Sequence, residues 1–168
     1  MPKRNMILDC SIADAVLKYC ESTFILPDDL LRLAIQQPSK EPFLIDARQV
    51  AGRDKTERML KILAYLWRMA PESFEKAAAG IHGHKRVWFS KSEKEIWESG
   101  SSNFCQKVGE SLWFVSTNCP MEGMKARVEK VMRGMGFSWR YTNLVAWSIY
   151  DRKGRIYPGD YFESEKKG

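Results

Sequence analysis

The amino-acid sequence predicts an α+β protein in two parts: a small N-terminal dimerisation unit at residues 1–37, and a mostly helical domain with a small antiparallel sheet at residues 42–168. Three observations support this fold class. Apolar residues recur at helical spacing in several segments, other short segments alternate apolar and polar residues as strands do, and a polar, proline-containing linker at residues 38–41 separates the two parts. With 44% apolar residues in a chain of 168, the larger part can bury a sizeable core.

Residues 1–37 show the order strand, helix, turn, helix. Residues 4–9 contain a short apolar run that fits a strand, Ser11 can cap the first helix, and Pro27 suits the first position of the second. A unit of this size cannot bury a core alone. We therefore expect it to form a homodimer by pairing its strand with the strand of a second copy.

Two helices are expected to supply much of the core of the larger part. Asp54 can cap the first of them, and Pro71 can begin the second, which would end at Gly80. The apolar stripe that the first helix should bury comprises Met59, Ile62, Leu63, Leu66 and Met69.

Short strands are expected farther along the chain. The alternation of apolar and polar residues predicts strands at residues 87–89, 111–116, 144–150 and 155–157. Gly154 would lie in a hairpin turn between the last two, at a position that requires a positive φ.

A short helix and a long basic helix complete the larger part. Ser90 and Glu93 form a capping-box pattern for the short helix, and the long helix begins after Pro120 with N–H groups that can bind a phosphate. Its buried face is predicted to comprise Met124, Val128, Val131 and Met135. Its exposed face is predicted to carry Lys125, Arg127, Lys130 and Arg133.

The positive charge of the chain is concentrated in the larger part. The formal net charge is +6, but residues 1–41 hold five basic and six acidic residues, which leaves 22 basic and 15 acidic residues for the remainder. An excess of this sign favours a polyanionic partner for the larger part and disfavours one for the first. A basic surface with no such partner is the alternative.

The sequence offers no sign of a metal site, a cofactor or a disulfide framework. The cysteines are widely spaced without a Cys-x-x-Cys pair, so we expect reduced thiols. They are Cys10, Cys20, Cys105 and Cys119. His82 and His84 flank a glycine with no cysteine or carboxylate nearby, which makes a poor metal site.

Membrane and enzyme functions are also disfavoured. No apolar run approaches the roughly 20 residues that span a bilayer, and the start of the chain lacks a secretory apolar region, so we expect a cytoplasmic protein with no membrane partner. No paired carboxylates, nucleophile with a base, or glycine-rich phosphate loop is evident. We therefore expect no enzyme activity; a nuclease is the enzymatic alternative.

Three stretches resemble the C-terminal DNA-binding domain of the SeqA family: residues 81–89 (IHGHKRVWF), 113–118 (WFVSTN) and 128–137 (VEKVMRGMGF). The resemblance covers roughly residues 5–137. Near the N-terminus it includes Leu8, Asp9 and the stretch 29–32, where the family has a ribbon-helix-helix-like oligomerisation unit. It therefore implies a homodimer through the N-terminal unit, which can extend to higher oligomers.

The resemblance also implies a binding site for double-stranded DNA. In the family, two loops read GATC sites that carry N6-methyladenine in the major groove. By position, the loops comprise Gly83, His84, Lys85 and Arg86, and Thr117, Asn118, Cys119 and Pro120. The chemistry suits Asn118, because its carboxamide can pair with adenine N6 and N7, and a methylated N6 keeps one hydrogen to donate. Arg86 can bind a guanine or a phosphate.

The chain departs from the family pattern at three of these positions. The family has arginine in place of His84, threonine in place of Lys85 and a second asparagine in place of Pro120. Proline cannot supply an amide contact, so recognition of the methylated pair would be weaker, altered, or moved to Cys119 and backbone groups.

Several residues in and beside these loops also have a purely structural interpretation. Asn118 could be the N-cap of the helix that follows, since asparagine is a leading capping residue. Lys85 and Arg86 could form a solvated strand end, and His82 is better explained as a turn or packing residue than as a base reader.

The function implied by the resemblance is a methylation-sensitive, nucleoid-associated DNA-binding protein that negatively regulates replication initiation, transcription or both. The alternative is a dimeric repressor that reads a different or unmethylated operator. The strand of a ribbon-helix-helix repressor enters the major groove. The acidic balance of the first part, with Asp9 at the end of its strand, speaks against that use.

Overall fold

The computed structural model describes residues 10–23, 41–81, 83–100 and 104–150. The expected strand at residues 4–9, the helix at Pro27, the linker and the hairpin at Gly154 lie outside the described residues. The two-part organisation and the ribbon-helix-helix-like unit therefore stay predictions. Within the first part, α1 (Cys10–Thr23) confirms the first helix, but Ser11 lies inside it, so the prediction that Ser11 caps the helix is wrong.

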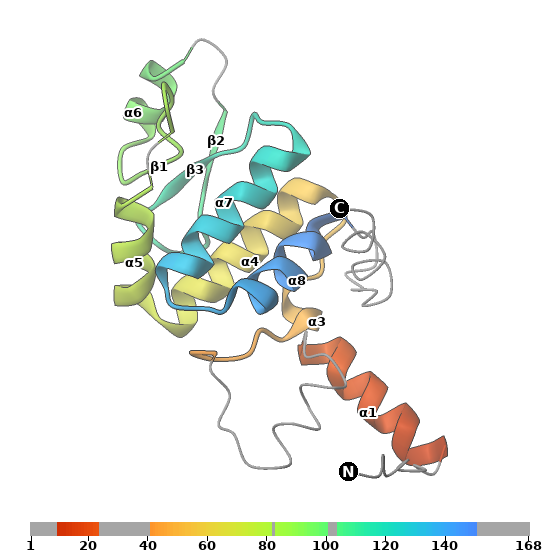
Figure 1. Cartoon of the computed structure of the whole chain (residues 1–168). Coiled ribbons are helices and arrows are strands. Elements are labelled where there is room, and N and C mark those ends of the chain that lie inside the picture. The colour runs from red at the N-terminus through yellow and green to blue at the C-terminus, as the bar shows by residue number, and fades with distance from the viewer. Residues whose placement is uncertain (1–9, 24–40, 82, 101–103, 151–168) are drawn as a thin grey trace, which may run out of the picture.

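Helices dominate the described chain, and a small sheet lies at one end of them (Figure 1). The helices are α1 (Cys10–Thr23), α3 (Ala47–Val50), α4 (Lys55–Met69), α5 (Pro71–Ala79), α6 (Glu93–Glu98), α7 (Met121–Gly134), α8 (Trp139–Trp147) and the 3-10 helix η1 (Ser148–Tyr150). The strands are β1 (Phe89–Ser90), β2 (Cys105–Lys107) and β3 (Phe114–Ser116). None of the described helices is long and apolar enough to cross a membrane.

The centre of the fold is the contact of α4 with α5 and α7, and α8 packs on α7. The predicted cap of α4 is confirmed, because the Asp54 carboxylate accepts a hydrogen bond from the Glu57 N–H at 2.9 Å. Four residues of the predicted stripe are fully buried: Met59, Ile62, Leu63 and Leu66. The prediction for Met69 is wrong, since its side chain is 48% exposed. The chain turns into α5 at this point, and Ala70 packs against the core instead.

The strands form an antiparallel sheet in the order β1-β3-β2. Phe89 pairs with Val115, and Cys105 pairs with Ser116. The strands predicted at residues 87–89 and 111–116 are confirmed in part: β1 begins two residues later and ends one residue later than predicted, and β3 is shorter. β2 was not predicted.

Two local predictions on the sheet side and at the C-terminal end are wrong. Ser90 and Glu93 do not form the predicted capping box. The cap of α6 is Ser92, whose hydroxyl accepts a hydrogen bond from the Glu95 N–H. The Ser90 hydroxyl instead donates to the Glu95 carboxylate and accepts from the Ser92 N–H. Residues 144–150 form the end of α8 and η1 instead of a strand. Residues 144–146 are all buried because this part of α8 is covered on every side. They are therefore all apolar, and such an unbroken apolar run resembles a buried strand.

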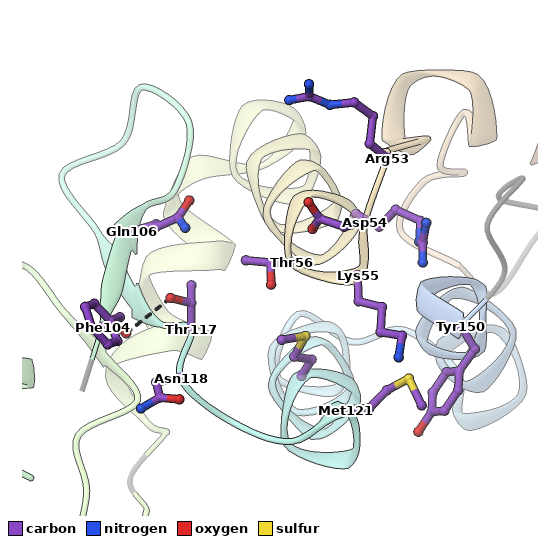
Figure 2. Close-up of a pocket in the computed structure, with 12 residues that line it drawn as sticks. Arg53, Asp54, Lys55, Thr56, Phe104, Gln106, Thr117, Asn118, Met121 and Tyr150 are labelled. Carbon is purple, nitrogen blue, oxygen red and sulfur yellow. Dashed lines mark hydrogen bonds between the residues drawn. The ribbon is translucent and has the colours of Figure 1, made fainter. Parts of the chain in front are cut away.

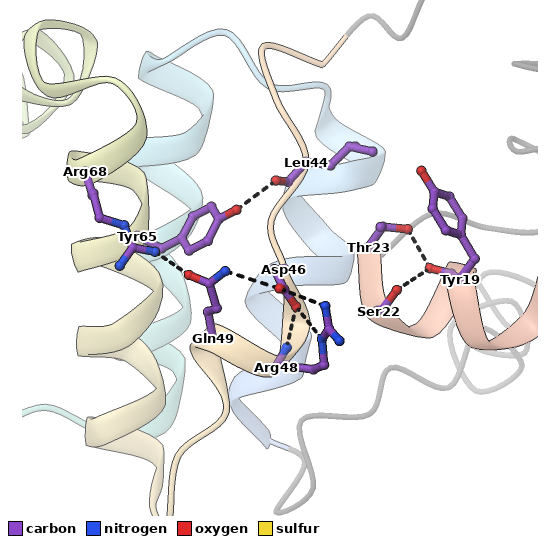
Figure 3. A network of polar contacts seen from close by, with 9 residues as sticks. All are labelled: Tyr19, Ser22, Thr23, Leu44, Asp46, Arg48, Gln49, Tyr65 and Arg68. Atoms are coloured by element: carbon purple, nitrogen blue, oxygen red, sulfur yellow. Dashed lines mark hydrogen bonds and ion pairs between the residues drawn. The ribbon is translucent and has the colours of Figure 1, made fainter.

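The segment before α4 is fixed by a polar network (Figure 3). Asp46 caps α3 by accepting from the Arg48 N–H at 3.0 Å, and it also binds the Arg48 guanidinium. The side chain of Gln49 donates to Asp46 and accepts from Arg68 on α4, so the network ties α3 to the central helix. Helix α3 also contacts α1.

Candidate functional site

The two predicted loops lie side by side at one end of the sheet. Because β1 and β3 are antiparallel, the start of β1 lies next to the end of β3. The Ser116 N–H donates to the Trp88 carbonyl at 2.9 Å and joins the two chain segments at that point. The first loop, residues 83–86, leads into β1 through residues 87 and 88, and it therefore lies next to the second loop, residues 117–120.

The first loop closes tightly over the indole of Trp88. A Cβ atom at Gly83 would lie 2.4 Å from the Arg86 carbonyl oxygen and 2.5 Å from Trp88 Nε1, so only glycine fits the loop as it is. Three consecutive side chains are exposed on it: His84, Lys85 and Arg86. His82 lies outside the described residues.

The second loop is anchored through the backbone of Phe104. Its carbonyl accepts hydrogen bonds from the Thr117 N–H at 2.7 Å, the Thr117 hydroxyl at 3.2 Å and the Asn118 N–H at 3.4 Å. Thr117 is buried by these contacts, Cys119 is partly buried, and Asn118 and Pro120 are exposed. Thr117 thus holds the loop in place, and the Asn118 side chain is presented at the surface.

Pro120 occupies the N-cap position of α7. The structural interpretation in which Asn118 is the N-cap is therefore wrong, since Asn118 lies two residues before it. Proline has no side-chain acceptor, and the first turn closes through the Pro120 carbonyl, which accepts from the Gly123 N–H at 2.9 Å.

Arg127 lies between the two loops, and its predicted exposure is wrong. The side chain is 3% exposed. Its guanidinium carbon lies 4.6 Å from the centre of the Trp88 ring, and its nitrogens donate to the Gly123 carbonyl at 2.7 Å and to the Ser116 hydroxyl at 3.4 Å. Sequence reasoning missed this residue, although Met124, Arg127 and Val128 follow the i, i+3, i+4 spacing of a buried face.

Burial also shifts the ionisation of the groups around Arg127. Burial lowers the pKa of Arg127. The nearby Cys119 raises this pKa, and the positive charge of Arg86 lowers it further. Burial raises the pKa of the Cys119 thiol, and the Arg127 charge opposes this rise. Lys130 also contacts the Trp88 ring, with its ammonium nitrogen 4.4 Å from the ring centre.

A groove of about 1070 Å³ borders the second loop (Figure 2). Its walls come from the start of α4, from β2, from the second loop and from Tyr150, and Figure 2 places Asn118 and Lys55 on opposite sides. The polar side chains that line it include Arg53, Lys55, Thr56, Gln106, Thr117 and Asn118. Arg58 in its wall is buried and donates to the Ile149 and Gly52 carbonyls. The exposed cations of the groove are Lys55 and Arg53, and Arg53 pairs with Glu57.

Over the described ranges, the structure holds no group of three histidine, cysteine or acidic side chains that could bind a metal ion. The polar groups gathered around the two loops are cationic, amide and hydroxyl side chains. These groups bind anions and hydrogen-bonding edges of a partner.

The fold and this site define a class of α+β domain in which a helical core carries a small antiparallel sheet with two polar loops at one end. The chain belongs to the SeqA protein C-terminal domain family, whose model matches residues 41–147. Proteins called negative modulator of initiation of replication are similar to it. The one from Tolumonas auensis is 30% identical over 96 residues, which is 56% of each chain. The one from Proteus mirabilis is 28% identical over 118 residues, which is 67% of this chain and 64% of that protein.

The crystal structure of V. cholerae SeqA has the same fold, with a TM-score of 0.53 and 23% sequence identity. The match covers 60% of this chain and 95% of the V. cholerae chain. The matched part of this chain spans 56% and 64% of the length of the two curated relatives above.

Proposed function

We propose that this protein binds double-stranded DNA through the two loops and acts as a negative modulator of replication initiation. The observation that carries the proposal is the placement of exposed basic side chains on the first loop beside the exposed Asn118 on the second. Basic groups bind phosphates without reading sequence, whereas a carboxamide can read a base edge. Family membership and the names of the relatives point to the same activity.

The specific target in this proposal is a GATC site with N6-methyladenine. Asn118 would pair with the adenine in the major groove, where N6 still donates one hydrogen after methylation. Arg86 would bind a neighbouring guanine or phosphate. Pro120, which is exposed at the start of α7, cannot donate an amide hydrogen, so Asn118 would carry more of the base recognition alone.

The protein would act on chromosomal DNA as a binding protein and not as an enzyme, and would repress replication initiation, transcription or both. The N-terminal segment would supply a homodimer, so that two sites are bound at once and gain from their effective concentration. The second candidate, a repressor of an unmethylated operator, keeps the same loops and differs only in the target.

The test measures binding of the full-length protein to one duplex in unmethylated, hemimethylated and fully methylated forms, with a scrambled duplex as reference. The proposal expects salt-dependent binding to all four duplexes and a preference for a methylated form. Equal affinity for all four would exclude methylated GATC recognition, and preference for the unmethylated duplex would favour the second candidate.

A further inference from the structure

A buried arginine at the junction of the two loops calls for an explanation. Arg127 is 3% exposed, and its Nε has no hydrogen-bond partner in the part of the chain that the structure describes. A buried charge with an unsatisfied donor is costly, and an apolar side chain of similar size would avoid that cost. Its contacts extend in two directions, one toward each loop.

On one side, Arg127 reaches the first loop through Trp88. Its guanidinium packs on the Trp88 ring, with 4.6 Å between the guanidinium carbon and the ring centre. The indole nitrogen of the same ring lies directly under Gly83, where an added Cβ would approach it to 2.5 Å. Any movement of Arg127 is therefore transmitted to the loop that carries the exposed basic side chains.

On the other side, Arg127 reaches the second loop. It donates to the Ser116 hydroxyl, at the end of β3, and to the Gly123 carbonyl. A Cβ at Gly123 would lie 3.0 Å from both Arg127 Nη1 and Cys119 Cβ, so the guanidinium, Gly123 and Cys119 are closely packed. Cys119 is the residue directly after Asn118, so this contact fixes the backbone that presents the carboxamide.

We propose that Arg127 is a positioning residue that couples the two loops, so that Asn118 and Arg86 are held at a fixed separation. This inference rests on the proposed DNA binding by these loops. Because Arg127 is buried, it would not touch the DNA. Its effect is to order both loops before binding, which reduces the cost of ordering them in the complex. The gain in affinity is therefore confined to DNA that contacts both loops at once.

The first test compares Arg127→Met and Arg127→Lys with the parent protein. Methionine keeps a long unbranched side chain without the charge, so the fold should persist with little change in thermal stability. We expect Arg127→Met to weaken binding to the preferred duplex by about tenfold and binding to scrambled DNA by less than about threefold. Arg127→Lys should recover part of the loss, because lysine keeps the cation over Trp88. Equal weakening on both duplexes would overturn the proposal.

The second test needs no DNA and so separates this inference from the proposed function. In amide NMR spectra of the full-length protein, Arg86→Ala should shift the signals of Asn118 and Cys119 in the parent but not in the Arg127→Met background. Lys94→Ala, an exposed cation on α6, is the matched control and should leave both signals in place. The proposal is overturned if Arg86→Ala leaves the second loop unchanged in the parent, or shifts it equally in both backgrounds.

Discussion

The hydroxyl of Tyr141 donates a hydrogen bond to the carbonyl of Thr23 at 2.8 Å. The same hydroxyl accepts one from the Ile45 N–H, also at 2.8 Å. One side chain on α8 therefore ties the end of α1 to the segment that leads into α3. The N-terminal helix is held on the family domain by a specific contact, and the strength of that contact can be measured.

Tyr141→Phe should lower the free energy of unfolding by about 1–3 kcal/mol, because it leaves the buried Ile45 N–H without its acceptor. Chemical denaturation of the full chain measures the change. Tyr65→Phe is the matched control, since the Tyr65 hydroxyl makes a single, longer bond of 3.2 Å to the Leu44 carbonyl and should cost less. An equal cost for the two substitutions would show that the Tyr141 bridge adds nothing specific.

Stability should fall at high pH because two tyrosines resist ionisation. Burial raises the pKa of Tyr141 well above its usual range, and burial together with the hydrogen bond to Glu122 raises the pKa of Tyr150 to about 12. A raised folded-state pKa stabilises the protein fully below the unfolded value of about 10, and that stability is lost as the pH rises toward 12. Denaturation at pH 9, 10, 11 and 12 measures this, and Tyr150→Phe should flatten the decline. A constant stability over this range would contradict the prediction.

Gly83→Ala should impair DNA binding with little loss of stability. The added methyl would collide with the Trp88 indole and with the Arg86 carbonyl, so the first loop must move. We expect affinity for the preferred duplex to fall by about tenfold or more, since a misplaced reading loop loses its base contacts. Gly80→Ala is the control: the nearest atom to its added methyl lies at 3.6 Å, and φ is −80°. Similar losses for both variants would show that the first loop is not the sensitive element.

Arg86→Ala and Asn118→Ala should differ in their response to salt. If Arg86 binds a phosphate, its removal should weaken binding on all duplexes and lower the slope of log affinity against log salt concentration by about one unit. Asn118→Ala should leave that slope unchanged, because a carboxamide releases no counterion. Affinities at four salt concentrations on scrambled DNA provide the comparison. If only Asn118→Ala lowered the slope of log affinity against log salt concentration, the assignment of Arg86 to the phosphate and of Asn118 to the base would be wrong.

Features that depend on neighbouring residues along the chain were predictable from the sequence. The Asp54 cap, the start of α5 at Pro71 and the buried stripe of α4 apart from Met69 are local, and each was predicted. The placement of the two loops together follows from their resemblance to a known family and from the antiparallel pairing of β1 with β3. Their roles as DNA readers remain predictions.

The missed features depend on residues that are distant in sequence. Its spacing with Met124 and Val128 places Arg127 on the buried face of α7, but the helix itself does not indicate that Trp88, from another segment, packs on the guanidinium. β2 carries little apolar alternation and is defined by its pairing with β3. Residues 144–146 are buried around a helix, so their apolar run resembles a strand more than an amphipathic helix.

The most direct measurement is the affinity of the parent protein and of Asn118→Ala for the same duplex with and without N6-methyladenine. Gln49→Ala is the matched control, because it removes an exposed carboxamide on α3, away from the loops. We predict that the parent prefers the methylated duplex and that Asn118→Ala lowers this affinity by about 1–3 kcal/mol, with far less effect on scrambled DNA. A parent without methylation preference, or an Asn118→Ala variant that retains the full preference, would contradict the assignment of Asn118 as the base-reading residue.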